Sequence, residues 1–172
     1  TTGPQYPRHL ESIPLFEKAR YSVSWAGEEE SENWFHIARE YTEKWHHQQQ
    51  IRDAVGKSGI MHRELFYPCI DTFMRALPHT YRNVAAPEGT LIKISVSTDA
   101  GGDWFLKYQQ GKWIMITNKE GNVADASVTL TPDTSWKLFT KGMTATDAIA
   151  KSQMSGDIKL TRPLFGMLSV MA

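Results

Sequence analysis

Residues 31–54 read SENWFHIAREYTEKWHHQQQIRDA and contain neither glycine nor proline. Apolar and aromatic side chains recur at steps of three and four residues, which predicts a helix with one face turned toward the protein interior. The face expected to be buried carries Trp34, Ile37, Ala38, Tyr41, Trp45, Gln48 and Arg52. The opposite face gathers His36, Glu40, Glu43 and His47. This second face is either exposed to solvent or turned into a helical bundle, where it would hold a metal ion.

Glu43 and His47 are the candidate metal ligands. They are four residues apart, so their side chains lie one turn apart on the same side of the expected helix. A carboxylate oxygen and an imidazole nitrogen at this spacing can converge on zinc or a similar divalent ion. In the alternative interpretation, Glu43 only raises the pKa of the neighbouring imidazole. His46, three residues after Glu43, is a competing ligand.

The run REYTEKWHHQQQIRDAVG, residues 39–56, resembles the metal-bearing helix of the DinB-like bundle family. More narrowly, it resembles the mycothiol-dependent maleylpyruvate isomerase branch, whose motif matches Glu43, His47 and Gln50. The resemblance implies that Glu43 and His47 are the second and third metal ligands, and that the first is a histidine on an earlier helix. Because only 42 residues precede Glu43, we expect that the upstream helices of the bundle are missing. His9 could substitute for that histidine, although it lies in a proline-flanked segment.

Composition excludes several classes of function. The 19 basic and 19 acidic residues balance, so the chain lacks the basic excess that is typical of nucleic-acid binding. Cys69 is the only cysteine, which rules out an internal disulfide and favours a reducing compartment, so we expect a cytoplasmic location. No apolar run approaches the length of a membrane span, and we expect no membrane partner.

The segments around the first helix predict further helical structure. Residues 9–20 indicate a short or broken helix, residues 21–27 an extended connector, and Ser31 a helix N-cap. Residues 63–77 predict a second long helix that ends at Pro78. Its apolar stripe comprises Leu65, Phe66, Cys69, Ile70, Phe73, Ala76 and Leu77. On this stripe, Cys69 is interpreted as a buried, inert thiol rather than a nucleophile.

Residues 78–89 separate a helical part, residues 1–80, from a second part, residues 85–172. Four segments of the second part alternate apolar and polar residues, which predicts a meander of antiparallel strands. They are residues 90–98, 104–109, 112–117 and 126–131. Short helices are expected from Pro132 and from Thr144. A last strand, broken by Gly156, is expected at residues 154–160, and an apolar helix from Pro163 to Ala172.

This second part resembles the sterol-carrier-protein-like fold, which follows the bundle in the isomerase branch. The expected fold class is therefore α+β, a partial DinB-like bundle followed by an antiparallel sheet with helices. The combined resemblance implies a fragment of a metal-dependent isomerase or transferase that acts on a small-molecule substrate. Its cofactors would be a divalent metal such as zinc and a low-molecular-weight thiol such as mycothiol. Two alternatives stay open. One is a lipid- or hydrophobic-ligand-binding module with an apolar cavity under the last helix, and the other is a non-catalytic structural protein.

Overall fold

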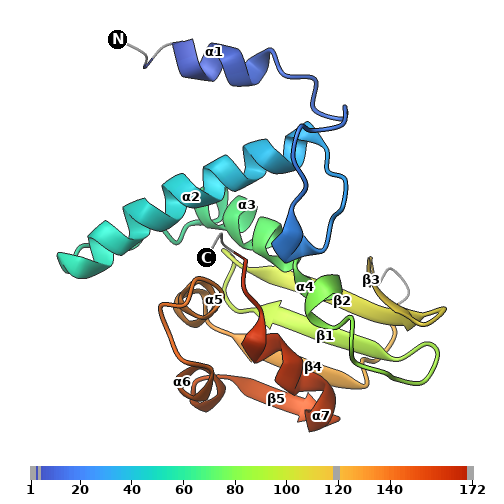
Figure 1. Ribbon diagram of the computed structural model, residues 1–172. Helices are drawn as coiled ribbons and strands as arrows, with labels where there is room; N and C mark the ends of the chain where they lie inside the picture. The colour runs from blue at the N-terminus through green and yellow to red at the C-terminus, as the bar shows by residue number, and fades with distance from the viewer. Residues whose placement is uncertain (1–2, 4, 118–120, 170–172) are drawn as a thin grey trace.

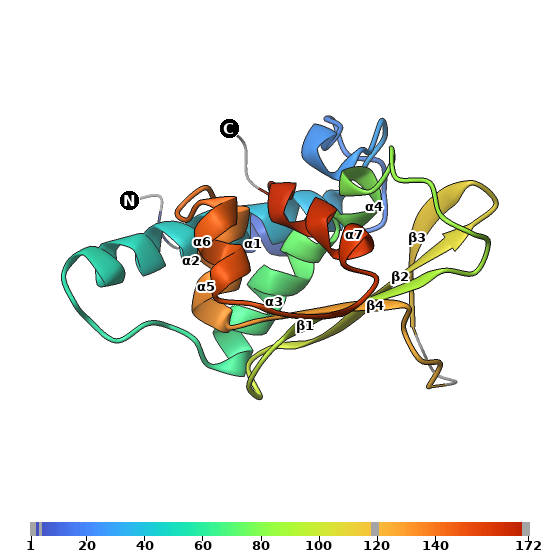
Figure 2. The same ribbon diagram turned by 90° about the horizontal axis from the view of Figure 1, so that it is seen from below.

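The chain folds as an α+β protein with one mixed sheet and helices gathered on one face of that sheet (Figure 1, Figure 2). The computed structural model describes residues 3, 5–117 and 121–169. Its five strands lie in the order β3-β2-β1-β4-β5. Their bounds are β1 Leu91–Val96, β2 Gly102–Gln109, β3 Lys112–Ile116, β4 Ala126–Leu130 and β5 Gln153–Gly156. The alternating pattern therefore located the first four strands to within two residues at each end.

The expected antiparallel meander is wrong in its fourth strand. β1 pairs antiparallel with β2, and β2 with β3, but β4 lies parallel to β1 on its other side. The connection from β3 to β4 spans residues 117–125, which is longer than a tight hairpin turn allows. It lets β4 place Ala126, Val128 and Leu130 beside the apolar residues of β1. As a result, β1, four of whose six residues are buried, lies at the centre of the sheet.

The helical part begins differently from the expectation. Helix α1 spans Gln5–Glu11, earlier than the broken helix predicted at residues 9–20. The connector predicted as extended contains a short 3-10 turn, η1, at Ser24–Ala26. Helix α2 spans Asn33–Ala54, with Glu32 rather than Ser31 at its N-cap. Helix α3, Arg63–Met74, and the short α4, Leu77–Thr80, replace the single predicted helix at residues 63–77.

The predicted buried face of α2 is wrong by about one residue, or about 100° of rotation. The buried residues are Phe35, Thr42, Trp45, His46 and Gln49. Trp34 and Tyr41 are half-buried because their polar tips form hydrogen bonds, Trp34 Nε1 with Glu32 and Tyr41 Oη with the Leu65 carbonyl. Gln49 tolerates burial because its Oε1 accepts from the Ile60 amide at 2.9 Å.

The carboxy-terminal helices agree only in part with the prediction. Helices α5, Pro132–Phe139, and α6, Ala145–Ala150, are confirmed, and Thr131 and Thr144 cap them through their hydroxyls. The last strand ends early, at Gly156, where φ is +74° and a Cβ would overlap the Asp125 carbonyl oxygen. The expected final α-helix is replaced by α7, Ile158–Thr161, and a 3-10 turn, η2, Arg162–Gly166. Val170 and Met171, which were expected to belong to that final α-helix, lie outside the described residues.

One apolar core joins the helices to the sheet. It runs from Trp45 through α3 to the strands and to Phe165 and Met167 near the carboxy terminus. Two buried hydroxyls fasten this last segment, with Tyr81 Oη donating to the Leu160 carbonyl and Ser169 Oγ to the Phe73 carbonyl. The division into residues 1–80 and 85–172 stays a prediction. Within the described ranges, no helix is both long enough and apolar enough to cross a membrane.

Candidate functional site

Glu43 and His47 converge on the outer side of α2. Glu43 Oε2 and His47 Nε2 are 3.7 Å apart, and the two side chains are 40% and 68% exposed. Gln50 Oε1 lies 3.1 Å from His47 Nδ1. Because an amide oxygen only accepts, the Nδ1–H of His47 donates to Gln50, and this contact leaves Nε2 on the side of the ring that faces Glu43. A hydrogen bond of this kind orients the histidine ligands of metal sites.

The described residues supply two metal ligands at this position and no third. Nowhere in residues 3, 5–117 and 121–169 do three His, Cys, Asp or Glu side chains gather closely enough to hold an ion together. His9, the possible substitute, is exposed on α1. A catalytic zinc site takes three protein ligands and a structural site four. The donor types and their orientation therefore suit a divalent ion, whereas the number of donors falls short by at least one.

His46 lies on the inner side of α2 and is 7% exposed. Its ring stacks on His47 and meets Trp136 of α5 edge-on, with centroid distances of 5.5 and 5.9 Å. Among the described residues its Nε2 has no hydrogen-bond partner. Burial, reinforced by the charge of His47, lowers the pKa of His46 despite the opposing effect of Glu43. The neutral imidazole is therefore a packing element between the two helices.

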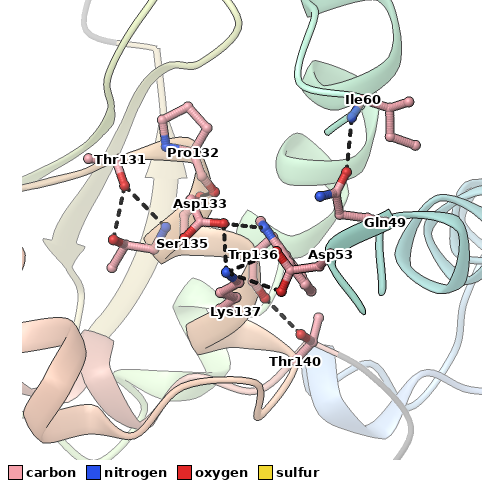
Figure 3. Close-up of polar contacts among 11 residues, drawn as sticks. Gln49, Asp53, Ile60, Thr131, Pro132, Asp133, Ser135, Trp136, Lys137 and Thr140 are labelled. Atoms are coloured by element: carbon pink, nitrogen blue, oxygen red, sulfur yellow. Dashed lines mark hydrogen bonds and ion pairs between the residues drawn. The ribbon is translucent and has the colours of Figure 1, made fainter. Parts of the chain in front are cut away.

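The carboxy-terminal half of α2 is fastened to α5 by an ion-pair bridge (Figure 3). Lys137 Nζ lies 3.0 Å from Asp133 on its own helix and 3.3 Å from Asp53 on α2. Burial lowers the pKa of Lys137, but the two carboxylates outweigh this effect and raise it. Beside the bridge, Trp136 packs edge-on against Trp45 at 6.1 Å. These contacts fix the position of the segment that carries His46 and His47.

A groove of about 400 Å³ runs between α1, the following loop and the outer side of α2. Its lining includes four apolar or aromatic residues, here called the apolar wall, and four charged or imidazole residues of α2, here called the polar wall. The first set is Leu10, Ile13, Tyr21 and Ile37, and the second is His36, Arg39, Glu40 and Glu43. Glu43 thus belongs both to the groove and to the pair with His47. The groove was not predicted, because residues 9–20, which include Leu10 and Ile13, were expected to form only a short or broken helix with no partner assigned to its apolar side chains. Their apolar character, close to an acid-and-imidazole helix face, was the available signal.

The two sides of the groove are held together by different contacts. Tyr6 of α1 donates its hydroxyl to Glu40 at 3.1 Å, and Lys44 lies 3.9 Å from the centre of the Tyr6 ring. Helix α1 has no buried residue. The loop after α1 is fixed more firmly, because the amide of Trp34 bonds to the Leu15 carbonyl at 2.8 Å. We therefore expect the α1 side of the groove to be the more easily displaced.

A second apolar hollow lies near the carboxy terminus, where the lipid-binding interpretation expects a cavity. Its volume is about 290 Å³, and Met143, Phe165 and Leu168 are among its lining residues. Phe165 is a core residue, whereas Leu168 is 39% exposed. The hollow is therefore a surface depression beside α5 and α6 rather than a tunnel through the core.

Comparison with known proteins gives structural neighbours only. No protein-family model matches the chain, and no curated protein matches it. Sterol Carrier Protein 2 Like 2 from Aedes aegypti is 19% identical with a TM-score of 0.42, covering 58% of this chain and 95% of that one. A sterol carrier protein domain from Helicoverpa armigera is also 19% identical, with a TM-score of 0.42 and coverage of 56% and 83%. The ubiquinone synthesis protein UbiJ-SCP2 is 13% identical, with a TM-score of 0.38 and coverage of 57% and 94%.

These neighbours are sterol-carrier-protein-2-like domains, in agreement with the sterol-carrier-like part of the expected resemblance. At such identities and TM-scores the likeness says nothing about ligand or activity. The DinB-like part of the resemblance stays a prediction, as do the metal ligands Glu43 and His47.

Proposed function

We propose that this chain binds a small, largely apolar molecule in the groove between α1 and α2. The observation that carries the proposal is the groove itself, about 400 Å³ in volume with one apolar and one polar wall. Ligand sites in proteins are typically clefts of about 300 to 1,000 Å³ that combine apolar walls with a few polar groups. The unpaired Cys69 fits a cytoplasmic location, which is part of this proposal.

The test measures binding of a neutral apolar fluorophore, N-phenyl-1-naphthylamine, to the whole chain. Ile13→Asp and Ile37→Asp place a charge in the apolar wall and should each weaken binding roughly tenfold, the equivalent of about 1.4 kcal/mol. Ile158→Asp is the matched control, because Ile158 is 41% exposed on α7, away from the groove. Circular dichroism checks that each variant folds. Equal binding by all four proteins, or no binding by wild type, would reject the proposal.

A second function is favoured by the geometry of Glu43 and His47. We propose that the two side chains are ligands of a divalent ion, zinc or a similar metal, in a thiol-dependent enzyme of the maleylpyruvate isomerase-like class. Support comes from the 3.7 Å approach of Oε2 and Nε2, from the Gln50 hydrogen bond that turns Nε2 toward Glu43, and from the sequence resemblance. When bound, such an ion supplies a Lewis acid that stabilises a thiolate. Its third protein ligand would come from outside the described residues.

The metal proposal is tested by zinc titration against a chromophoric chelator. Two protein ligands leave an ion mostly hydrated, so we expect this chain to bind zinc only weakly. Glu43→Gln and His47→Ala should each abolish the weak binding, and the double variant should add little, because both groups act on one ion. His46→Ala and Glu64→Gln serve as controls. Zinc binding unchanged by both single changes at positions 43 and 47 would refute this assignment.

A further inference from the structure

Two opposite charges on the polar wall of the groove are left without a strong protein partner. Arg39 is half-buried, and the only hydrogen bond of its side chain among the described residues joins Nη1 to His36 Nδ1 at 3.3 Å. Glu43 approaches only His47, at 3.7 Å. The two residues are one helical turn apart on the same wall, yet no ion pair of 4.0 Å or less joins them in the described part of the chain. Both charges therefore remain available to a ligand.

His36 holds Arg39 in place and leaves most of its donors free. His36 Nε2 lies 2.8 Å from the Tyr21 carbonyl oxygen, so this nitrogen carries the proton and donates. Nδ1 of a neutral His36 must then accept, and the Arg39 guanidinium donates to it. A guanidinium has five N–H donors, and the planar pair of nitrogens matches a carboxylate. Arg39 is thus oriented by one hydrogen bond while its other donors remain unused by described residues.

The other acid of this wall is already engaged. Glu40 accepts a hydrogen bond from Tyr6 of α1 at 3.1 Å, which uses it to hold α1 in position. The polar wall therefore carries one guanidinium and two carboxylates, and of the two carboxylates only Glu43 accepts no hydrogen bond of 3.5 Å or less from a described residue. A purely anionic ligand would be attracted by Arg39 but repelled by Glu43. A purely cationic ligand would be attracted by Glu43 but repelled by Arg39. A headgroup with both charges satisfies both residues.

We infer that the groove binds a molecule with an α-amino-acid-type headgroup on an apolar body. Its carboxylate lies at Arg39, its ammonium group at Glu43, and its apolar part against Ile13 and Ile37. This inference rests on the proposed function, since it names the ligand class of the same groove. It concerns the metal-free chain, in which Glu43 is unoccupied by an ion.

The test compares three compounds that share a phenyl body and differ in headgroup, with a chelator present. They are phenylalanine, 3-phenylpropanoate, which lacks the ammonium group, and 2-phenylethylamine, which lacks the carboxylate. Calorimetry or chemical-shift titration of wild type should show phenylalanine binding at least about tenfold more tightly than either truncated compound, because each charge-assisted contact is worth about that factor. This comparison needs no variant and is independent of effects on folding.

Two variants then assign each charge to one residue. Arg39→Met should weaken phenylalanine and 3-phenylpropanoate roughly tenfold and leave 2-phenylethylamine unchanged, whereas Glu43→Gln should weaken phenylalanine and 2-phenylethylamine and leave 3-phenylpropanoate unchanged or improved. Arg162→Met and Glu64→Gln, at exposed positions outside the groove, should change none of the three affinities.

The outcomes separate this inference from the proposed function. Equal affinity for the three compounds, or affinities that neither Arg39→Met nor Glu43→Gln changes, would overturn the headgroup assignment while the neutral fluorophore still binds. If the fluorophore and all three compounds fail to bind, both the inference and the groove function are rejected.

Discussion

Helices α2 and α3 pack against each other but bury different kinds of side chain. Helix α3 turns an almost unbroken apolar stripe into the core, including the fully buried Phe66, Ile70 and Phe73. Helix α2 buries Thr42, His46 and Gln49 beside only two aromatic residues, Phe35 and Trp45. Apolar burial thus stabilises α3, whereas α2 depends on a few directed contacts. The outer side of α2 is free to form the groove and the Glu43–His47 pair.

The largest effect on stability is expected when a buried isoleucine of α3 is replaced by alanine, and an exposed isoleucine of α2 serves as its comparison. Ile70 of α3 is fully buried, so Ile70→Ala should lower the free energy of unfolding by about 2 to 5 kcal/mol. Ile51 of α2 is 60% exposed, so Ile51→Ala should change it by less than about 0.5 kcal/mol. Urea denaturation measures both. Similar losses from the two changes would contradict the contrast between the helices.

The polar burial of α2 predicts a stabilising substitution. Replacing His46 by leucine removes a buried nitrogen that has no partner, which should raise the free energy of unfolding by about 1 to 2 kcal/mol near pH 8. The gain should grow as the pH falls below 6.5, the ordinary pKa of histidine. There the unfolded chain takes up a proton that the folded chain, with its lowered His46 pKa, does not bind, and wild type loses stability. A gain independent of pH would show that His46 titrates normally.

Cys69 tests whether the thiol on the α3 stripe is only a packing element. It is fully buried, and burial, with a smaller contribution from Glu43, raises the pKa of its thiol. Cys69→Ala should cost about 1 kcal/mol of stability through a small cavity. Ligand binding in the groove should be unchanged. Loss of binding without a change in melting temperature would instead assign a functional role to the thiol.

The smallest effect is expected from the bridge between α5 and α2. Lys137→Met breaks the pairs with Asp53 and Asp133, whose carboxylates are about half exposed, so the expected loss is only about 0.5 kcal/mol. Amide hydrogen exchange should nevertheless become faster in the carboxy-terminal half of α2. Lys151→Met, on an exposed lysine without an ion pair among the described residues, is the control. Unaltered exchange in α2 would mean that Trp45 and Trp136 alone hold this end.

Local patterns predicted some parts of the structure well. The alternation of Ile92, Ile94 and Val96 marked β1, and the apolar stripe around Ile70 identified the buried face of α3. The buried face of α2 escaped prediction because Trp34 and Tyr41 count as apolar in a periodic pattern although their polar tips bond at the surface. Gln49 counts as polar, yet the Ile60 amide satisfies it inside the protein.

The candidate site also has one part that local sequence patterns predicted and one part that they did not. The spacing of Glu43 and His47 already implied that a carboxylate and an imidazole would lie one turn apart, because four residues advance an α-helix by about one turn. The groove beside them depends on α1 and the loop around Ile13, which lie some 30 residues away in sequence. No periodicity links segments so far apart.

The sequence by itself therefore determined the α+β class, most of the strands, the face of α3 and the relative placement of Glu43 and His47. These features follow from side chains two to four residues apart, and the backbone geometry of strands and helices fixes their directions. Only the tertiary structure decided that β4 runs parallel beside β1, that His46 faces Trp136, and that Arg39 and Glu43 share a groove with Ile13. Those features depend on which distant surfaces pack together, and that choice is made by the total apolar area buried and by the polar groups satisfied across the whole chain.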